Sequence, residues 1–259
     1  MQPNVWHDSV AGKWRAWYST FSSCNGVSNG PNHDKNSPFC CQALPSRCPG
    51  NSSDPPYPKS ALASNKEGGV FCYAESDEPG SPTKPFTKPV LNLVEFPAGS
   101  GNKSNNILIN PGLDSAGGGL GTGVTLDLSS PSANRSRWKL FGETSGSNTA
   151  KRLLLSESND GTHFFGTHNV SIDHGRWDTH KNVVWDPVTR RWVGYVRCDP
   201  NAGLRVQCWI ESETEDFATT RWTTPRPTGL NTTGAFQPDA LVVFRYEGVW
   251  IGFANVFSE

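Results

Sequence analysis

The histidine and carboxylate side chains whose spacing suits chemistry lie in the second half of the chain. Asp178 and His180 are two residues apart, so on a β-strand both side chains face the same side. An imidazole beside a carboxyl group can tune its proton affinity, as acid–base chemistry requires. His168, His174 and His180 are evenly spaced, but a spacing of six residues fits neither one helix face nor a zinc loop. The spacing therefore favours a polar site on a strand over a metal centre.

The amino-acid composition excludes several classes of partner. The chain has 259 residues, with 23 Lys and Arg against 24 Asp and Glu, so no basic surface for nucleic acid or for an anionic membrane is expected. No apolar run reaches the length of about 18 residues that a membrane-spanning helix needs. The glycine-rich run at residues 117–121 is not followed by a helix-forming segment, so it does not indicate a nucleotide-binding loop.

Short β-strands are the elements expected to position the candidate side chains. The chain contains 26 Gly and 20 Pro but a single Met, and helix interiors tolerate Gly and Pro poorly. Tight turns between strands, in contrast, need both residues. Ten Trp, 13 Phe and five Tyr supply the apolar surface of a folded core. The composition therefore predicts an all-β protein.

One strand pattern recurs along the chain. An apolar strand, a short polar turn and an aromatic-rich strand follow one another, as in a β-hairpin. This pattern occupies residues 4–19, 182–197 and 240–255, with a looser copy at 123–143. A further strand that ends in Glu-Ser, followed by an acidic turn, occurs at residues 70–80, 152–164 and 206–222. Hairpin, third strand, acidic turn and edge strand together make one four-stranded blade of a β-propeller.

The repeat divides a single propeller domain into blades. We expect the first blade at about residues 1–89, the second at 90–164, the third at 165–227 and the start of the next at 228–259. In the second blade, Ser158, Asp160 and Gly161 are predicted to form the acidic turn, with Asp160 capping backbone N–H groups and Gly161 in the strained position. Because a few blades cannot bury all their faces, we expect this chain to be part of a longer protein.

Cysteine usage points to an oxidising compartment. Four of the seven cysteines lie in a Pro-, Asn- and Ser-rich stretch at about residues 22–68: Cys24, Cys40, Cys41 and Cys48. This stretch is expected to be a disulfide-stapled insertion in the first blade. Cys198 and Cys208 flank a short linker, where two antiparallel strands can bring them face to face as a second bridge.

Five glycosylation sequons favour the same compartment. They begin at Asn51, Asn102, Asn134, Asn169 and Asn231. Together with the cysteines, they predict a secreted glycoprotein. The first residues contain neither a basic nor an apolar segment, so the signal peptide is expected to be missing from this chain.

The order of these motifs resembles that of a known family. The hairpin at residues 182–197 and the strand and acidic turn at 206–222 are preceded by Gly-Arg-Trp-Asp-Thr at 175–179. This arrangement is similar to the five-bladed β-propeller glycoside hydrolases of family 32 and their relatives in families 43 and 68. The similarity runs over nearly the whole chain, apart from the Cys-rich insertion. It implies a central funnel, lined by the first strand of each blade, in which carboxylates act on a glycosidic bond.

The site residues of the family carry over unevenly. Asp178 matches the aspartate of the family's Arg-Asp-Pro block, with one residue between it and Arg176. Gln2 stands where the nucleophilic Asp is expected and Gln237 where the general-acid Glu is expected, and an amide performs neither task. Asp239 lies beside the second position, so the resemblance implies Asp178 and Asp239 as a rearranged catalytic pair. The substrate-binding residues that it implies are Arg176, Trp177, His180, Asn4, Trp6 and Gln237.

Three functions are compatible with this pattern. The first is hydrolysis of oligo- or polysaccharides, and the second is carbohydrate binding without catalysis, in which Trp6, Trp177 and Phe236 stack on sugar rings. The third is a scaffold that binds protein. Asp8 and Glu247 fall in predicted hairpin turns and are expected to be exposed. The expected partner is a carbohydrate, and no cofactor is expected, since nothing in the sequence specifies the calcium that some family-43 relatives hold.

Overall fold

The computed structural model describes residues 4–21, 69–81, 83–95, 101–109, 122–128, 136–143, 153–170, 181–198, 205–230 and 236–258. The regular secondary structure in these ranges consists of β-strands, β1 to β14, which confirms the predicted all-β class. No described segment forms a helix long and apolar enough to cross a membrane. The expected insertion at about residues 22–68 lies outside the described residues.

The strands form three four-stranded sheets and one two-stranded sheet, each antiparallel and in chain order. The first sheet contains β1 (Asn4–Asp8), β2 (Lys13–Phe21), β3 (Gly69–Ser76) and β4 (Ile107–Ile109). The second contains β5 (Gly123–Leu126), β6 (Trp138–Glu143), β7 (Leu153–Ser158) and β8 (Phe165–Val170). The third contains β9 (Asn182–Asp186), β10 (Arg191–Cys198), β11 (Val206–Glu211) and β12 (Arg226–Pro227). The fourth contains β13 (Phe236–Tyr246) and β14 (Val249–Ser258).

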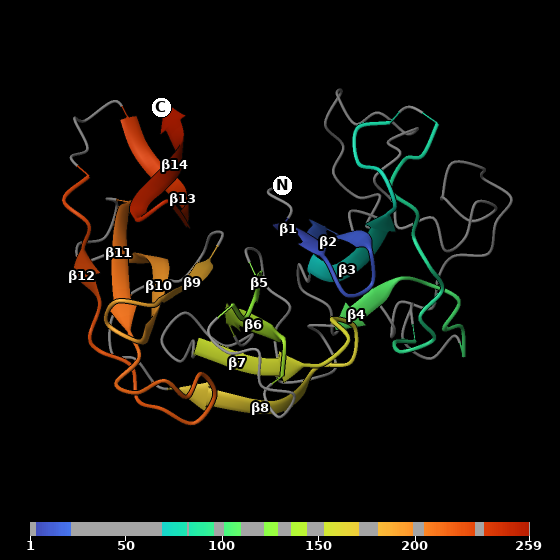
Figure 1. The fold of residues 1–259 in the computed structure, drawn as a ribbon, viewed down its shortest axis with the longest axis horizontal. Helices are drawn as coiled ribbons and strands as arrows, with labels where there is room; N and C mark the ends of the chain where they lie inside the picture. Colours follow the sequence, from blue (N-terminus) through green and yellow to red (C-terminus); the bar gives the residue numbers. More distant parts are fainter. Residues whose placement is uncertain are drawn as a thin grey trace, which may run out of the picture.

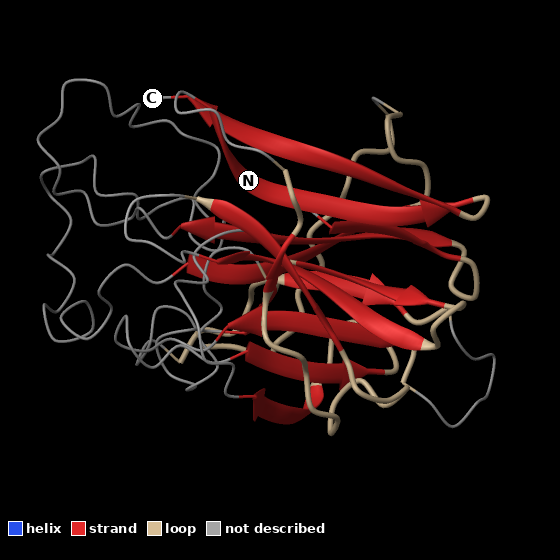
Figure 2. Ribbon diagram, turned by 90° about the vertical axis from the view of Figure 1, so that its left-hand side faces the viewer, coloured by secondary structure: helices blue, strands red, loops and turns tan. Residues whose placement is uncertain are grey.

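The first strand of each sheet lies toward the centre of the molecule (Figure 1). These inner strands are β1, β5, β9 and β13; β5 contacts β1 and β9, and β13 contacts β9. The later strands of each sheet lie further out, and Figure 2 shows that the strands of all sheets run roughly along one direction. The inner strands begin at one common end of the sheets, here called the leading end. Asn4 contacts Thr122 there, Gly123 contacts Lys181, and Gln237 contacts Arg205 at the start of β11.

Two glycines allow neighbouring sheets to approach each other. A Cβ atom on Gly123 would lie 2.2 Å from the backbone oxygen of Lys181, and one on Gly194 would lie 2.5 Å from the ring of Phe141. Neither distance leaves room for a side chain. Glycine at these positions therefore lets β5 lie against the start of β9 and lets β10 pack on β6.

The hydrophobic core lies between neighbouring sheets. Trp17 and Trp138 are fully buried between the first and second sheets, with ring centroids 4.6 Å apart. Trp192 of β10 and Phe217, in the loop between β11 and β12, pack with Phe141 of the second sheet in a separate cluster. Because each aromatic side chain can bury about 150–250 Å², the aromatic-rich second strands supply much of the apolar contact between sheets.

The predicted hairpins and the predicted acidic turn are present. The hairpins are β1–β2, β5–β6, β9–β10 and β13–β14. In the second sheet, the Asp160 carboxylate accepts hydrogen bonds from the backbone N–H groups of Thr162 and His163, and Gly161 has a φ of 78°. The fourth strand of the first sheet, β4, ends at Ile109, and that of the second sheet, β8, ends at Val170.

The expectation that Asp8 is exposed is wrong. Its carboxylate is buried and forms ion pairs with Arg15 Nε at 2.9 Å and Arg137 Nη2 at 2.7 Å. Arg137 directly precedes β6, so the charge links the first sheet to the second. Glu247 is exposed, as expected, and has a φ of 45° in the turn between β13 and β14.

The predicted disulfide between Cys198 and Cys208 is confirmed. It joins β10 to β11 at the leading end, with a Cα–Cα distance of 5.9 Å. The cysteines of the expected insertion lie outside the described residues, and Cys72 is buried in the first sheet.

Candidate functional site

The sequence-predicted site residues fall into two groups. Those outside the described residues are Arg176, Trp177, Asp178 and His180. Those that the structure describes are Asn4, Trp6, Gln237 and Asp239, on the inner strands β1 and β13. Asn4, Gln237 and Asp239 lie in the first residues of their strands, so the structure brings them to the leading end.

Asp239 is oriented by a β-bulge near the start of β13. The register of β13 with β14 shifts between Pro238 and Ala240, which leaves Asp239 without a cross-strand partner. A bulge re-aims a side chain that regular strand alternation would place elsewhere. The partly exposed carboxylate faces the third sheet, with Oδ1 3.3 Å from Arg205 Nη1 and 3.8 Å from Arg197 Nη1.

Two glutamines connect β13 to the third sheet beside Asp239. Gln207 Nε2 donates a hydrogen bond to the backbone oxygen of Pro238 at 3.1 Å, and Gln237 Oε1 accepts one from the backbone N–H of Arg205 at 3.3 Å. Both glutamine side chains are buried. The side-chain amide of Gln237 therefore takes part in a contact between β13 and the third sheet.

Side chains connect the inner strands to one another. Asn4 Nδ2 donates a hydrogen bond to the backbone oxygen of Thr122 at 3.2 Å, and Trp6 Nε1 donates one to that of Val124 at 2.9 Å. Both bonds hold β1 against β5. At the junction of β9 and β13, Asn182 occupies the equivalent place. The predicted sugar-binding residues Asn4 and Trp6 thus also have a structural task.

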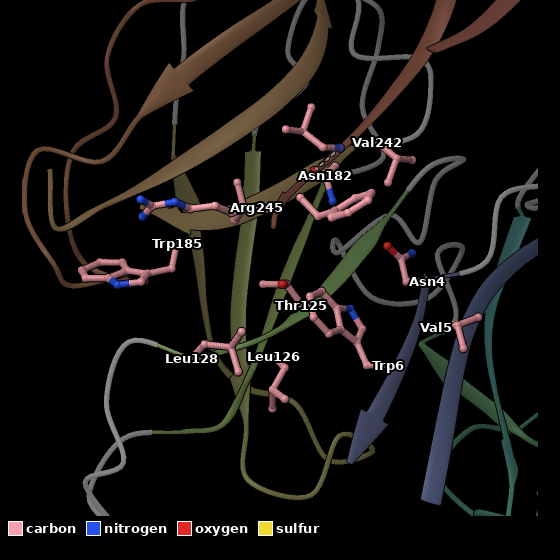
Figure 3. Close-up of a pocket in the computed structure, with 13 residues that line it drawn as sticks. Asn4, Val5, Trp6, Thr125, Leu126, Leu128, Asn182, Trp185, Val242 and Arg245 are labelled. Atoms are coloured by element: carbon pink, nitrogen blue, oxygen red, sulfur yellow. Dashed lines mark hydrogen bonds between the residues drawn. The ribbon is translucent and has the colours of Figure 1, made fainter. Parts of the chain in front are cut away.

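A pocket of about 450 Å³ lies between the inner strands (Figure 3). Most of its lining is apolar, and the polar and aromatic residues in it are Asn4, Trp6, Thr125, Asn182, Trp185, Phe244 and Arg245. Figure 3 shows the β1 residues on one side and the β9 and β13 residues on the other. No Asp or Glu is among the described residues that line it, and Arg245 Nη1 lies 3.5 Å from Asp186 Oδ1. The pocket can bind a polar ligand with aromatic faces nearby.

The sequence did not identify Asn182, Trp185 or the three arginines Arg197, Arg205 and Arg245 as candidate site residues. For Asn182 a signal existed, because Asn-Val-Trp at 4–6 and Asn-Val-Val-Trp at 182–185 begin equivalent hairpins. The arginines gave no signal, since their approach to Asp239 or Asp186 depends on how two separate sheets pack.

The arrangement at the leading end suits proton-transfer or nucleophilic chemistry by a carboxylate. Asp239 lies within ion-pair distance of Arg205, and a carboxylate in its ionised form can attack an electrophilic carbon or activate water. Among the described residues, no three His, Cys, Asp or Glu side chains converge as ligands for a metal ion. A second carboxyl group about 5–10 Å away would complete a glycosidase pair.

Comparison with known proteins shows a shared fold. No family model matches the chain, and no curated protein matches it. The chain is similar to the solved structure of an N-acetylgalactosamine deacetylase from F. plautii in complex with blood group B trisaccharide, with a TM-score of 0.52 and 12% sequence identity. The match covers 94% of this chain and 57% of that one, so this chain spans little more than half of the deacetylase.

Proposed function

We propose that this protein is a secreted glycoside hydrolase that acts at the leading end of a five-bladed β-propeller of the family-32 type. The observation that carries the proposal is the orientation of Asp239, because a bulge turns this carboxylate out of β13 toward Arg197 and Arg205. The similar solved structure is that of a carbohydrate-modifying enzyme, which agrees with a carbohydrate substrate. The Cys198–Cys208 disulfide agrees with an oxidising compartment.

Asp178 is the proposed second carboxyl group. It precedes Asn182 by four residues, so its Cα atom lies within about 14 Å of that of Asn182 in any chain conformation. Asn182 is hydrogen-bonded to Val243, which follows Asp239 by four residues. Asp178 and Asp239 thus precede two hydrogen-bonded residues of adjacent inner strands by the same number of positions, which supports their use as a pair.

In the proposed reaction, one water molecule is consumed for each glycosidic bond. Asp239, in its ionised form, attacks the anomeric carbon or removes a proton from the attacking water. Asp178, in its protonated form, transfers its proton to the leaving oxygen as the bond to the anomeric carbon breaks. The separation of the two carboxyl groups decides whether the configuration is retained, at about 5 Å, or inverted, at about 6.5–9.5 Å.

The test is release of reducing sugar from a panel of plant, algal and animal glycans. Wild type is compared with Asp178→Asn, Asp239→Asn and the matched control Asp77→Asn, which changes an exposed aspartate in the acidic turn after β3. We expect both site variants to lose at least about a hundredfold in rate and the control to keep full activity. Wild-type rates in both site variants would exclude the proposed pair.

The pocket of Figure 3 favours a second candidate function, carbohydrate binding without hydrolysis. Trp6 and Trp185 lie in this pocket beside amide and guanidinium groups, and no described carboxylate lines it. Aromatic faces with neighbouring polar groups are a common way to bind sugar rings. This candidate predicts that wild type binds a glycan without cleaving it, and that Trp185→Ala weakens binding while Asp239→Asn does not.

A further inference from the structure

Among the described residues that line the pocket of Figure 3, Arg245 is the charged one. It lies near the end of β13, and its side chain is 24% exposed. Figure 3 shows Arg245 and Trp185 on the side of the pocket opposite the β1 residues. A guanidinium group carries five N–H donors in a planar fork, which matches the oxygens of a carboxylate or of a tetrahedral oxyanion. The pocket therefore has the chemistry to recognise an anion.

The contact of Arg245 with Asp186 leaves this capacity largely unused. The distance from Arg245 Nη1 to Asp186 Oδ1 is 3.5 Å, whereas charge-assisted hydrogen bonds measure about 2.7–2.9 Å. Both oxygens of Asp186 accept hydrogen bonds within its own turn, Oδ1 from the backbone N–H of Val188 at 3.0 Å and Oδ2 from the hydroxyl group of Thr189 at 2.9 Å. The turn therefore holds the carboxylate of Asp186, and the guanidinium group can bind a second anion.

Two buried asparagines provide the pocket with groups that suit sugar hydroxyls. Asn4 and Asn182 are 8% and 6% exposed, and each uses one end of its amide for a contact with the backbone. Asn4 Nδ2 donates to the oxygen of Thr122, and Asn182 Oδ1 accepts from the N–H of Val243. Among the described residues, none is hydrogen-bonded to Asn4 Oδ1 or Asn182 Nδ2. One acceptor and one donor thus remain, and a hydroxyl group can pair with either.

We propose that the pocket binds an acidic sugar unit, whose carboxylate or sulfate group pairs with Arg245 while its ring packs against Trp185. This inference rests on the proposed function, because it takes the ligand to be a glycan and names its class as anionic. Asp239 and Arg245 are six residues apart on β13, about 20 Å along the strand. The substrate is therefore a chain, with the acidic unit held in the pocket and the bond that is cleaved at the leading end.

The test uses sugars that differ only at carbon 6. Galactose, galacturonate and galactose 6-sulfate carry a hydroxyl, a carboxylate and a sulfate group there, and glucose gives a second such series. Binding to the full chain is measured by titration calorimetry at low ionic strength, since salt screens charges. We expect an acidic sugar to bind about tenfold or more tightly than its neutral parent. The comparison of carboxylate with sulfate identifies which anion the pocket takes.

Substitutions of the two charged residues separate recognition from a structural ion pair. Arg245→Gln is expected to remove the preference for acidic sugars, and Arg245→Lys, which keeps the charge, to retain part of it. Asp186→Asn keeps a side-chain oxygen for its turn but removes the competing charge, so acidic sugars should bind to it several times more tightly than to wild type. If the ion pair were only structural, both residues' variants would weaken binding. The control Arg226→Gln, at an exposed arginine of β12, should bind as wild type does.

The outcomes distinguish this inference from the proposed hydrolase. Acidic sugars that bind through Arg245 would support the inference even if no glycan is hydrolysed, in which case only the hydrolase is excluded. A wild type that binds neither acidic series, or binds acidic and neutral sugars equally, would overturn the inference whatever the hydrolysis assay gives. A preference for acidic sugars that persists in Arg245→Gln would also overturn it, because another residue would then hold the anion.

Discussion

Asn182 Oδ1 accepts a hydrogen bond from the backbone N–H of Val243 at 2.9 Å, across the junction of β9 and β13. The two strands belong to different sheets and share no backbone ladder. The side chain of Asn182 thus satisfies a buried backbone donor that strand pairing leaves open. It also aligns β9 with β13, the two strands whose first residues lie at the leading end.

Replacing Asn182 by alanine is expected to destabilise the protein by about 1–3 kcal/mol, since the buried N–H of Val243 loses its partner. Urea unfolding of Asn182→Ala and of the exposed control Val188→Ala measures the difference. Equal midpoints for the two variants would contradict this structural task.

Gly123→Ala is expected to destabilise the protein by about 3 kcal/mol or more, because its Cβ would lie 2.2 Å from a backbone oxygen that cannot move alone. The matched control is Gly252→Ala, whose Cβ would meet only the tip of the Leu241 side chain at 3.3 Å. Thermal unfolding of both variants tests the close approach of β5 and β9. Similar melting temperatures would mean that the sheets are further apart.

Asp8 contributes stability that depends on pH. Burial raises the pKa of its carboxyl group, but hydrogen bonds from Arg137 and Ala11 and the charges of Arg15 and Arg137 outweigh burial, so the pKa lies below its usual value. A lowered folded-state pKa gives stability that is complete above the unfolded value of about 4 and is lost as the pH falls through the folded value.

Asp8→Asn keeps a side-chain oxygen for the turn but removes the charge. We expect a loss of about 2–4 kcal/mol at pH 7, measured by urea unfolding. The difference from wild type should shrink as the pH is lowered from 4 to 2. A difference independent of pH would show that the ion pairs with Arg15 and Arg137 do not stabilise the fold.

Asp239→Asn is expected to remove hydrolytic activity without a large change in the free energy of unfolding. The carboxylate is partly exposed and its two ion-pair distances are 3.3 and 3.8 Å, so its loss should change the free energy of unfolding by less than about 1 kcal/mol. The same variant should lose glycan hydrolysis. Chemical denaturation and the activity assay are run on one preparation, and a large loss of stability would make Asp239 a structural residue.

Removing the disulfide is expected to lower the stability of the third sheet. Cys198 and Cys208 close a loop of ten residues, and a loop of this size contributes about 2–3 kcal/mol. The double variant Cys198→Ala/Cys208→Ala is compared with Cys72→Ala, which leaves the bridge intact. Peptide mapping without reductant verifies the bridge, and equal stability of oxidised and double-variant protein would contradict its role.

Local patterns in the sequence predicted the local structure well. The alternation in residues 182–197 and 240–255 gave the hairpins, and Ser158, Asp160 and Gly161 gave the acidic turn, because turn chemistry and strand period are properties of neighbouring residues. The Cys198–Cys208 bridge followed from the short linker between two strands. β4 pairs with β3 although it lies far along the chain from the acidic turn that follows β3.

Contacts between sheets could not be predicted in this way. Asp8 was expected in a hairpin turn and hence exposed, yet it ends β1, and its buried carboxylate pairs with Arg137 beside the next sheet. Asn4 looked like a ligand-binding residue, and the structure gives its amide a backbone partner in β5. Both cases depend on residues more than a hundred positions away in the chain.

The sequence by itself determined the all-β class, the order of the hairpins and turns, one disulfide and Asp239 as a candidate. These features depend on residue type and short-range spacing. Only the tertiary structure decided that a bulge turns Asp239 toward Arg197 and Arg205, and that side chains of Asn4 and Asn182 join the inner strands. Such relationships arise from the packing of one sheet on another, which no local pattern in the chain encodes.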